Sequence, residues 1–201
     1  YKRQAQHRAA PGQLTNAEGH ELIDQLTSYE RPYPMLVLTG GDCFERPDLV
    51  DLIEYAVDKG LHVSISPSVT PLFTRERVKA VQDAGVSVMS MSLDGGSAET
   101  HDAFRGFPGT FDRTIEACHM LNELGMRFQL NTVFTAKNIH EAPQMLKNAI
   151  DLGAFMFYTF MLVPTGRGQH LDMLTPHERE DVLHWLHDNL SLIHISEPTR
   201  R

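Results

Sequence analysis

One unit recurs along the chain: a helix-forming stretch ends at a glycine, and an apolar, β-branched run begins directly after it. The glycines are Gly60, Gly85, Gly125 and Gly153, and the runs beside them are 61–66, 86–93, 127–134 and 154–163, with an earlier run at 35–39. Glycine ends helices because it adopts the left-handed backbone conformation at least cost. Near-continuous apolar runs are typical of parallel strands buried on both faces. The sequence therefore predicts parallel strands that alternate with helices.

Each segment between these runs has a helix-start signal and one apolar face. Thr15 and Glu18 match a capping box, in which each side chain bonds a backbone N–H of the other residue. Later helices are expected to start at Pro47, Thr74, Thr110, Asn138 and Thr175. Helices alternating with parallel strands imply right-handed crossovers. The predicted fold class is therefore α/β, an open or closed barrel with parallel strands and outer helices.

Length, charge and hydropathy narrow the class of protein. The 201 residues fit one domain. The formal net charge is −8 and the basic residues are not clustered, whereas nucleic acids and anionic membranes attract clustered lysine and arginine. The longest apolar run, at 155–163, is too short to cross a bilayer. We therefore expect neither nucleic acid nor membrane among the partners.

The two cysteines, Cys43 and Cys118, do not form a metal-binding spacing. They are also too few for a disulfide scaffold, which favours a reducing, cytoplasmic compartment. Cys118 shares an apolar helical face with Phe111, Ile115 and Leu121, so we expect it to be a core residue. No metal ligand is predicted in this sequence.

The two ends of the sequence carry separate expectations. The chain opens at Tyr1 rather than at methionine, which indicates a natural N-terminus further upstream. Residues 190–200 read LSLIHISEPTR, which resembles the translation of a sequencing adapter. We therefore expect residues 1–189 to form the native domain and residues 190–201 to be foreign to it. The alternative is a natural, strand-like C-terminal segment.

Polar residues and glycines follow the predicted strands, at the edge where parallel α/β folds bind ligands. Gly40 and Gly41 would let the backbone approach a ligand closely, and the carboxylate of Asp42 suits a ligand ammonium. Ser92 and Asp94 alternate at the end of the run at 86–93 and can both face a ligand, and Asn131 is a polar residue in the middle of the run at 127–134 that must find partners. The alternatives are plain turns, helix caps and internal hydrogen bonds.

Arg105 lies in a predicted loop at 101–109, among residues that favour turns. Its planar guanidinium suits a ligand carboxylate through paired hydrogen bonds. A solvated surface arginine is the alternative.

In chain order, these motifs resemble a radical S-adenosylmethionine (SAM) enzyme. The motifs are TGGD at 39–42, SLDG at 92–95, HDAFRGFPGTFDRTIEA at 101–117, NTVF at 131–134 and VPTGRG at 163–168. The resemblance covers nearly all of residues 1–189. It is closest to the subgroup with a C-terminal SPASM extension, which includes relatives of haem-biosynthesis and peptide-modifying enzymes. It implies a partial (βα)6 barrel that lacks the first strand and the cluster loop, so that the chain is truncated at both ends.

The resemblance also implies where SAM would bind. Gly40, Gly41 and Asp42 would meet its methionine amino end, although the family usually has glutamate where Asp42 stands. Ser92 and Asp94 would lie near the ribose or carboxylate, Arg105 would bind the carboxylate, Asn131 and Ser66 would line the cavity, and Val163 and Pro164 would offer backbone near the adenine. No catalytic residue is implied.

By the same resemblance, the parent enzyme holds a [4Fe–4S] cluster on a CxxxCxxC motif that would lie upstream of Tyr1. The cluster would cleave SAM reductively to a 5′-deoxyadenosyl radical that abstracts hydrogen from a small-molecule or peptide substrate. A ferredoxin or flavodoxin would supply the electron. Soft thiolate ligands suit such clusters, and Cys43 and Cys118 cannot replace the motif, so we expect the chain as given to be inactive.

Two other classes of protein remain open. One is a barrel without a cluster that binds a SAM-like ligand or a partner protein. The other is an unrelated aldolase-like barrel, which would need a lysine at a strand end. The lysines at 59, 79, 137 and 147 all fall in predicted helices or their caps, which disfavours the aldolase-like class.

Overall fold

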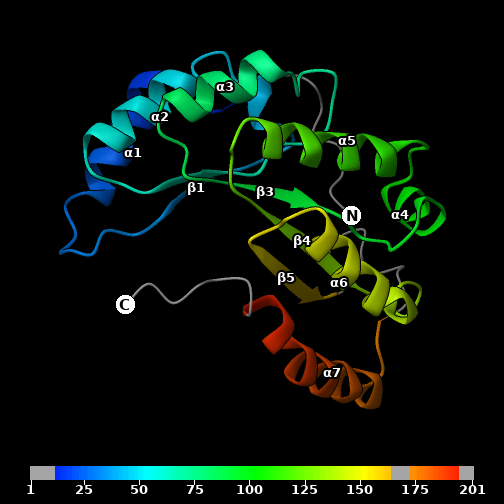
Figure 1. Cartoon of the computed structure of the whole chain (residues 1–201). Coiled ribbons are helices and arrows are strands. Elements are labelled where there is room, and N and C mark those ends of the chain that lie inside the picture. The colour runs from blue at the N-terminus through cyan, green and yellow to red at the C-terminus, as the bar shows by residue number, and fades with distance from the viewer. Residues whose placement is uncertain (1–11, 164–172, 195–201) are drawn as a thin grey trace. The chain divides into compact units, whose positions relative to one another are not determined.

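The computed structural model describes residues 12–163 and 173–194, with side chains up to residue 189. Within these residues the chain is an α/β fold whose five strands are ordered β1-β2-β3-β4-β5 in one sheet (Figure 1). The pairs β1–β2, β2–β3 and β4–β5 are parallel. This confirms the predicted α/β class with parallel strands between helices.

The described residues form two compact units. We call residues 12–91 and 116–128 the N-terminal unit, and residues 92–115, 129–163 and 173–194 the C-terminal unit.

The N-terminal unit holds the first three strands. Its elements are α1 (Asn16–Leu26), β1 (Leu36–Leu38), the 3-10 turn η1 (Cys43–Glu45), α2 (Leu49–Asp58), β2 (Val63–Ile65), α3 (Arg75–Asp83), nearly all of β3 (Val88–Ser92) and the second half of α5 (Thr110–Glu123). Helix α1 packs on α2 and α2 on α3 (Figure 1). The side chains at the centre of its core are inaccessible to solvent: Ile53, Ala56, Val63, Ile65 and Val78.

The C-terminal unit holds the last two strands. Its elements are α4 (Ala98–Arg105), the first half of α5, β4 (Phe128–Phe134) after its first residue, the 3-10 turn η2 (Ile139–Glu141), α6 (Ala142–Asp151), β5 (Met156–Met161) and α7 (Pro176–His194). Both α6 and α7 contact β5. Along β4, Leu130, Thr132 and Phe134 are buried and alternate with half-buried residues, among them Asn131. One face of β4 therefore belongs to the core, and the other leaves Asn131 partly accessible.

Each predicted strand is present, although each is shorter than its apolar run. The predicted capping box also forms at α1, where Thr15 N donates to Glu18 Oε2 at 2.7 Å and Glu18 N donates to Thr15 Oγ1 at 3.3 Å. Thr175 and Glu178 make the same pair of bonds at the start of α7.

The prediction of a loop at 101–109 is wrong in its first half. Helix α4 begins after Ser97, whose Oγ accepts a hydrogen bond from Thr100 N, and ends at Gly106, which has a φ of 77°. Hydrophobic periodicity misses this helix because its one buried residue is a histidine, His101. The helical stretch predicted to start at Asn138 does start there, but as the 3-10 turn η2, which leads directly into α6 at Ala142.

None of the described helices is both long and apolar enough to cross a membrane. Helix α7 extends to His194 and so includes the first residues of the segment that the sequence sets apart as foreign. Residues 195–201 of that segment lie outside the described residues.

Candidate functional site

The acidic residue of the SLDG motif is tied into the C-terminal unit. Asp94 follows β3, and its side chain is only 2% exposed. Its Oδ1 accepts a hydrogen bond from Val133 N at 2.9 Å. Its Oδ2 lies 2.5 Å from Arg105 Nη2, but this contact is an ion pair rather than an aligned hydrogen bond. The structure therefore joins two of the predicted site residues, Asp94 and Arg105, in direct contact.

Side chains from two other elements hold the backbone of Asp94. Its N–H donates to His101 Nδ1 in α4 at 3.0 Å. Its carbonyl accepts from Asn138 Nδ2 at 2.9 Å, and the same amide donates to Val133 O at 2.8 Å. All of these groups are buried or nearly so, and in such surroundings unmet hydrogen bonds are costly. Asp94 therefore has a fixed position relative to β4 and α4.

The two glycines after Asp94 allow α4 and α6 to approach the turn closely. A Cβ on Gly95 would lie 2.4 Å from His101 N, and a Cβ on Gly96 would lie 2.9 Å from Gln144 Cβ. The backbone of Gly96 is bonded on both sides, since its N–H donates to Glu141 Oε2 at 2.7 Å and its carbonyl accepts from Asn148 Nδ2 at 3.0 Å. Close packing explains the Gly-Gly pair without any ligand.

The HDAFRG segment supplies three different supports from one short helix. His101 holds the turn at Asp94, and Arg105 pairs with the Asp94 carboxylate. Asp102 accepts hydrogen bonds from Gly109 N, Thr110 Oγ1 and Phe111 N, which ties down the start of α5. Although burial raises the pKa of Asp102, these hydrogen bonds outweigh it and lower the pKa overall. Spacing along one helix thus places His101 and Arg105 beside Asp94 after β3, and Asp102 beside the start of α5.

His101 is as buried as Asp94, with 1% of its surface exposed. Burial, and then the positive charge of Arg105, lower its pKa to about 4. Its Nδ1 accepts the hydrogen bond from Asp94 N, so the neutral ring carries its proton on Nε2. The ring also packs edge-on against Phe111, with centroids 5.9 Å apart.

The other predicted residues of the C-terminal unit surround this pair. Ser92 is half-buried at the end of β3, and Leu93 N donates to Asn131 O at 2.9 Å, which sets Asn131 beside that strand end. The Asn131 Oδ1 accepts from Gln129 Nε2 at 3.0 Å. Val163 follows β5 and is 68% exposed. Pro164 lies outside the described residues.

The remaining predicted residues gather at the ends of β1 and β2 in the N-terminal unit. Asp42 is 9% exposed and accepts hydrogen bonds from Phe44 N, Ser68 N and Thr70 Oγ1. Ser68 Oγ donates to Gly41 O at 2.6 Å. A Cβ on Gly40 would meet nothing within 4 Å, so the backbone there is open on that side. Ser66 Oγ donates to Ser90 O at 3.4 Å.

Sequence reasoning missed the partners that hold these residues. They are Ser68 and Thr70 beside Asp42, and His101, Asn138 and Glu141 beside the turn at Asp94. The cluster of serine and threonine at 64–70, which begins in β2 and continues after it, was a usable signal for the first pair. Asn138 and Glu141 had no such signal, because their partners lie more than 40 residues away along the chain.

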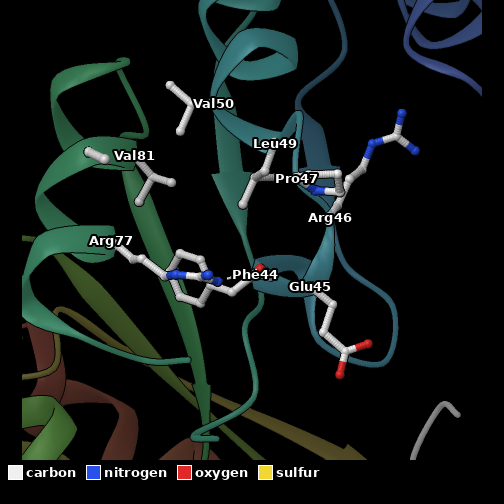
Figure 2. Close-up of a pocket in the computed structure, with 9 residues that line it drawn as sticks. Phe44, Glu45, Arg46, Pro47, Leu49, Val50, Arg77 and Val81 are labelled. Atoms are coloured by element: carbon white, nitrogen blue, oxygen red, sulfur yellow. Dashed lines mark hydrogen bonds between the residues drawn. The ribbon is translucent and has the colours of Figure 1, made fainter. Parts of the chain in front are cut away.

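The hollow in Figure 2 lies elsewhere in the N-terminal unit. It has a volume of about 290 Å³ and is lined by Phe44, Glu45, Arg46, Pro47, Leu49, Val50, Arg77, Ala80 and Val81. Arg77 reaches across it and donates to Phe44 O at 2.6 Å. None of the predicted site residues lines this hollow.

The described residues do not fit an iron–sulfur cluster. No group of three or more His, Cys, Asp or Glu side chains among them is placed to hold a metal ion. Cys43 and Cys118 are both buried in the N-terminal unit. Burial raises the pKa of the Cys118 thiol to about 12, which opposes the thiolate form that a metal requires.

We expect Cys118 to be unreactive in the folded chain. Raising its pKa from 9.0 to about 12 lowers the thiolate fraction about 1,000-fold at pH 8. Titration with a coloured disulfide reagent at pH 8 should therefore label Cys118 only after urea is added. The Cys43→Ser variant isolates this signal. Rapid labelling of that variant without urea would contradict the burial of Cys118.

Comparison with known proteins finds a family model and several relatives that match this chain. The model of the Radical SAM superfamily matches residues 6–149. The chain is 40% identical over 177 residues to the AdoMet-dependent heme synthase of Methanosarcina barkeri, covering 88% of this chain and 50% of that protein. It is 29% identical over 142 residues to the PqqA peptide cyclase of Bradyrhizobium diazoefficiens, covering 71% of this chain and 37% of that protein. The chain thus spans half or less of these relatives.

A solved structure shares the fold. Streptococcus suis SuiB bound to S-adenosylmethionine superposes with a TM-score of 0.69 at 14% identity, over 90% of this chain and 43% of SuiB. At this identity the likeness concerns the fold alone.

Proposed function

This chain belongs to the Radical SAM superfamily, and from that membership we propose that residues 1–189 form the SAM-binding part of a radical SAM enzyme. The observation that carries the proposal is Arg105. Its side chain is 24% exposed at the end of α4, and its one described ion pair, to Asp94, uses only part of its donor capacity. An accessible guanidinium with donors to spare is suited to a ligand carboxylate.

We place the other proposed contacts with SAM by the unit in which each predicted site residue lies. In the C-terminal unit, Ser92, Asn131, Val163 and Pro164 would line the nucleoside part of the ligand. In the N-terminal unit, Gly40, Gly41 and Ser66 would lie near its amino end. Asp42 already accepts hydrogen bonds at both carboxylate oxygens, so it would meet the ligand ammonium only through the acceptor capacity that these bonds leave unused.

The proposed chemistry belongs to the whole enzyme. In the full-length enzyme, a reduced [4Fe–4S] cluster would give one electron to SAM, whose cleavage would yield methionine and a 5′-deoxyadenosyl radical able to abstract hydrogen from the substrate. The sequence has no CxxxCxxC motif, so cysteines outside it would have to hold the cluster, and a ferredoxin or flavodoxin would reduce it. A SPASM-type extension also lies outside this sequence in the proposal.

For the substrate we propose a tetrapyrrole, because the relative at 40% identity is a heme synthase. A peptide is the second candidate, because the relative at 29% identity is a peptide cyclase. Assay of the full-length enzyme with each substrate class separates the two.

Binding of SAM to the chain tests the proposal directly. Calorimetric titration of the 201-residue chain should give saturable, one-to-one binding of SAM, and adenosine monophosphate serves as the control ligand. Absence of SAM binding, or equal affinity for both ligands, would overturn the proposed function.

Anaerobic reconstitution with iron and sulfide should load far less than one [4Fe–4S] cluster per chain, because both cysteines are buried. The measurement is iron and acid-labile sulfide per chain, with the full-length enzyme as the positive control. A stoichiometric cluster on the 201-residue chain would show that the proposed cluster ligands are misplaced. SAM binding without a cluster in the full-length enzyme would instead favour a ligand-binding module.

A further inference from the structure

We infer that Asp94 acts on the ligand through Arg105, as a positioning residue, and does not itself contact the nucleoside. This inference rests on the proposed function and concerns the same site. It replaces the sequence expectation that Asp94 lies against the ribose or carboxylate of SAM.

The first argument is access. The Asp94 side chain is 2% exposed, and its Oδ2 atom is buried without an aligned hydrogen bond from any described residue. A ligand hydroxyl could reach this oxygen only if the surrounding turn moved. Arg105, the other member of the pair, is 24% exposed. Of this pair, a ligand can therefore touch the Arg105 side chain and not the Asp94 carboxylate.

The second argument is rigidity. Asp94 is held at its carboxylate by Val133 N and at its backbone by His101 and Asn138. These bonds come from β4, from α4 and from the residue just before η2. A long arginine side chain loses rotamer freedom when it binds a ligand, and a fixed anchor reduces that loss.

The third argument is charge. The Asp94 carboxylate engages Nη2 of Arg105, and the remaining N–H groups of the guanidinium have no other partner that the structure describes. A guanidinium can bind two carboxylates through different N–H groups. Asp94 would thus orient the guanidinium, and the carboxylate of the ligand would take the donors that remain.

Two ligands separate this role from direct contact. SAM carries the amino-acid carboxylate, and 5′-methylthioadenosine carries the same nucleoside without it. Asp94→Asn keeps the shape and the Oδ1 acceptor but removes the charge that orients Arg105. Calorimetric titration should show SAM binding weakened about tenfold by Asp94→Asn, the usual order for a charged hydrogen bond, and 5′-methylthioadenosine binding changed less than twofold.

A double-mutant cycle completes the test. Arg105→Ala should weaken SAM binding at least as much as Asp94→Asn, and the double variant should bind SAM no worse than Arg105→Ala alone. The matched control is Asp112→Asn, at an exposed aspartate in α5 of the same unit, which should bind both ligands like the unmodified chain. Thermal unfolding followed by circular dichroism reports whether each variant is folded.

Several results would overturn the inference. Equal weakening of both ligands by Asp94→Asn would indicate direct contact with the nucleoside. Tighter SAM binding by Asp94→Asn would indicate that Asp94 competes with the ligand for Arg105. If Asp94→Asn does not fold, Arg105→Ala still decides, since unchanged SAM affinity in that variant excludes the role. Failure of the proposed function is distinguishable, because the unmodified chain would then bind neither ligand.

Discussion

Replacing Gly95 with alanine is expected to lower the free energy of unfolding by about 3 kcal/mol. A Cβ at this position would lie 2.4 Å from His101 N, 2.8 Å from His101 Cα and 2.9 Å from Thr100 C. All three atoms are backbone of α4, so no side-chain rotation can relieve the overlap. Either the turn after Asp94 or the helix must move, and the bond between Asp94 N and His101 would be lost with it.

The matched control is Gly106→Ala, at the other end of the same helix. Gly106 has a φ of 77°, and a Cβ there would meet nothing within 4 Å. The substitution should therefore lower the free energy of unfolding only by the cost of placing alanine in the left-handed conformation, about 1 kcal/mol. Urea unfolding followed by circular dichroism measures both variants. A Gly95→Ala loss no larger than that of Gly106→Ala would show that α4 does not pack against the turn as described.

Acidification from pH 7.5 to pH 5 is expected to lower the stability of the chain by about 2 kcal/mol through His101 alone. Burial and the charge of Arg105 lower the pKa of His101 from 6.5 to about 4 in the folded chain. Below pH 6.5 the unfolded chain therefore binds a proton that the folded chain does not, which favours unfolding. The loss continues to about pH 4, where the folded chain also becomes protonated.

The variant His101→Gln should lose this pH dependence, because its side chain does not titrate. It should also be less stable than the unmodified chain at pH 7.5, because the substitution removes the ring that packs against Phe111. The control is His119→Gln, at an exposed histidine in α5, which should keep the pH dependence of the unmodified chain. The midpoints of urea unfolding at pH 7.5, 6.5, 5.5 and 5.0 measure how the stability of each variant depends on pH. An unchanged slope in His101→Gln would exclude His101 as the source.

The alternation of helix and parallel strand was open to prediction because its signals are local. Glycines such as Gly60 and Gly85 follow helices, and apolar runs follow the glycines, so the order of the elements can be read within short windows. Helix α4 is the exception. Its only buried residue is His101, and a polar residue does not contribute to the hydrophobic periodicity that reveals a helix.

At the candidate site, residue chemistry alone pointed to Asp94 and Arg105, since a carboxylate and a guanidinium after a strand suit a charged ligand. That the two bind each other, and that Asp94 is buried while Arg105 is accessible, is visible only in the structure. The Glu141 bonds to Gly96 N, Ser97 and Thr100 were equally hidden, because they join the end of η2 to the turn after β3 and to the start of α4, more than 40 residues away in the chain.

The sequence by itself determined the element types, their order and the family, because propensity, periodicity and short motifs act between residues close along the chain. Only the tertiary structure decided which polar atoms meet, which of them a ligand can reach, and that His101 titrates far below its usual range. Those properties depend on distances and burial created when α4, β4 and α6 pack together, and no window of sequence contains them.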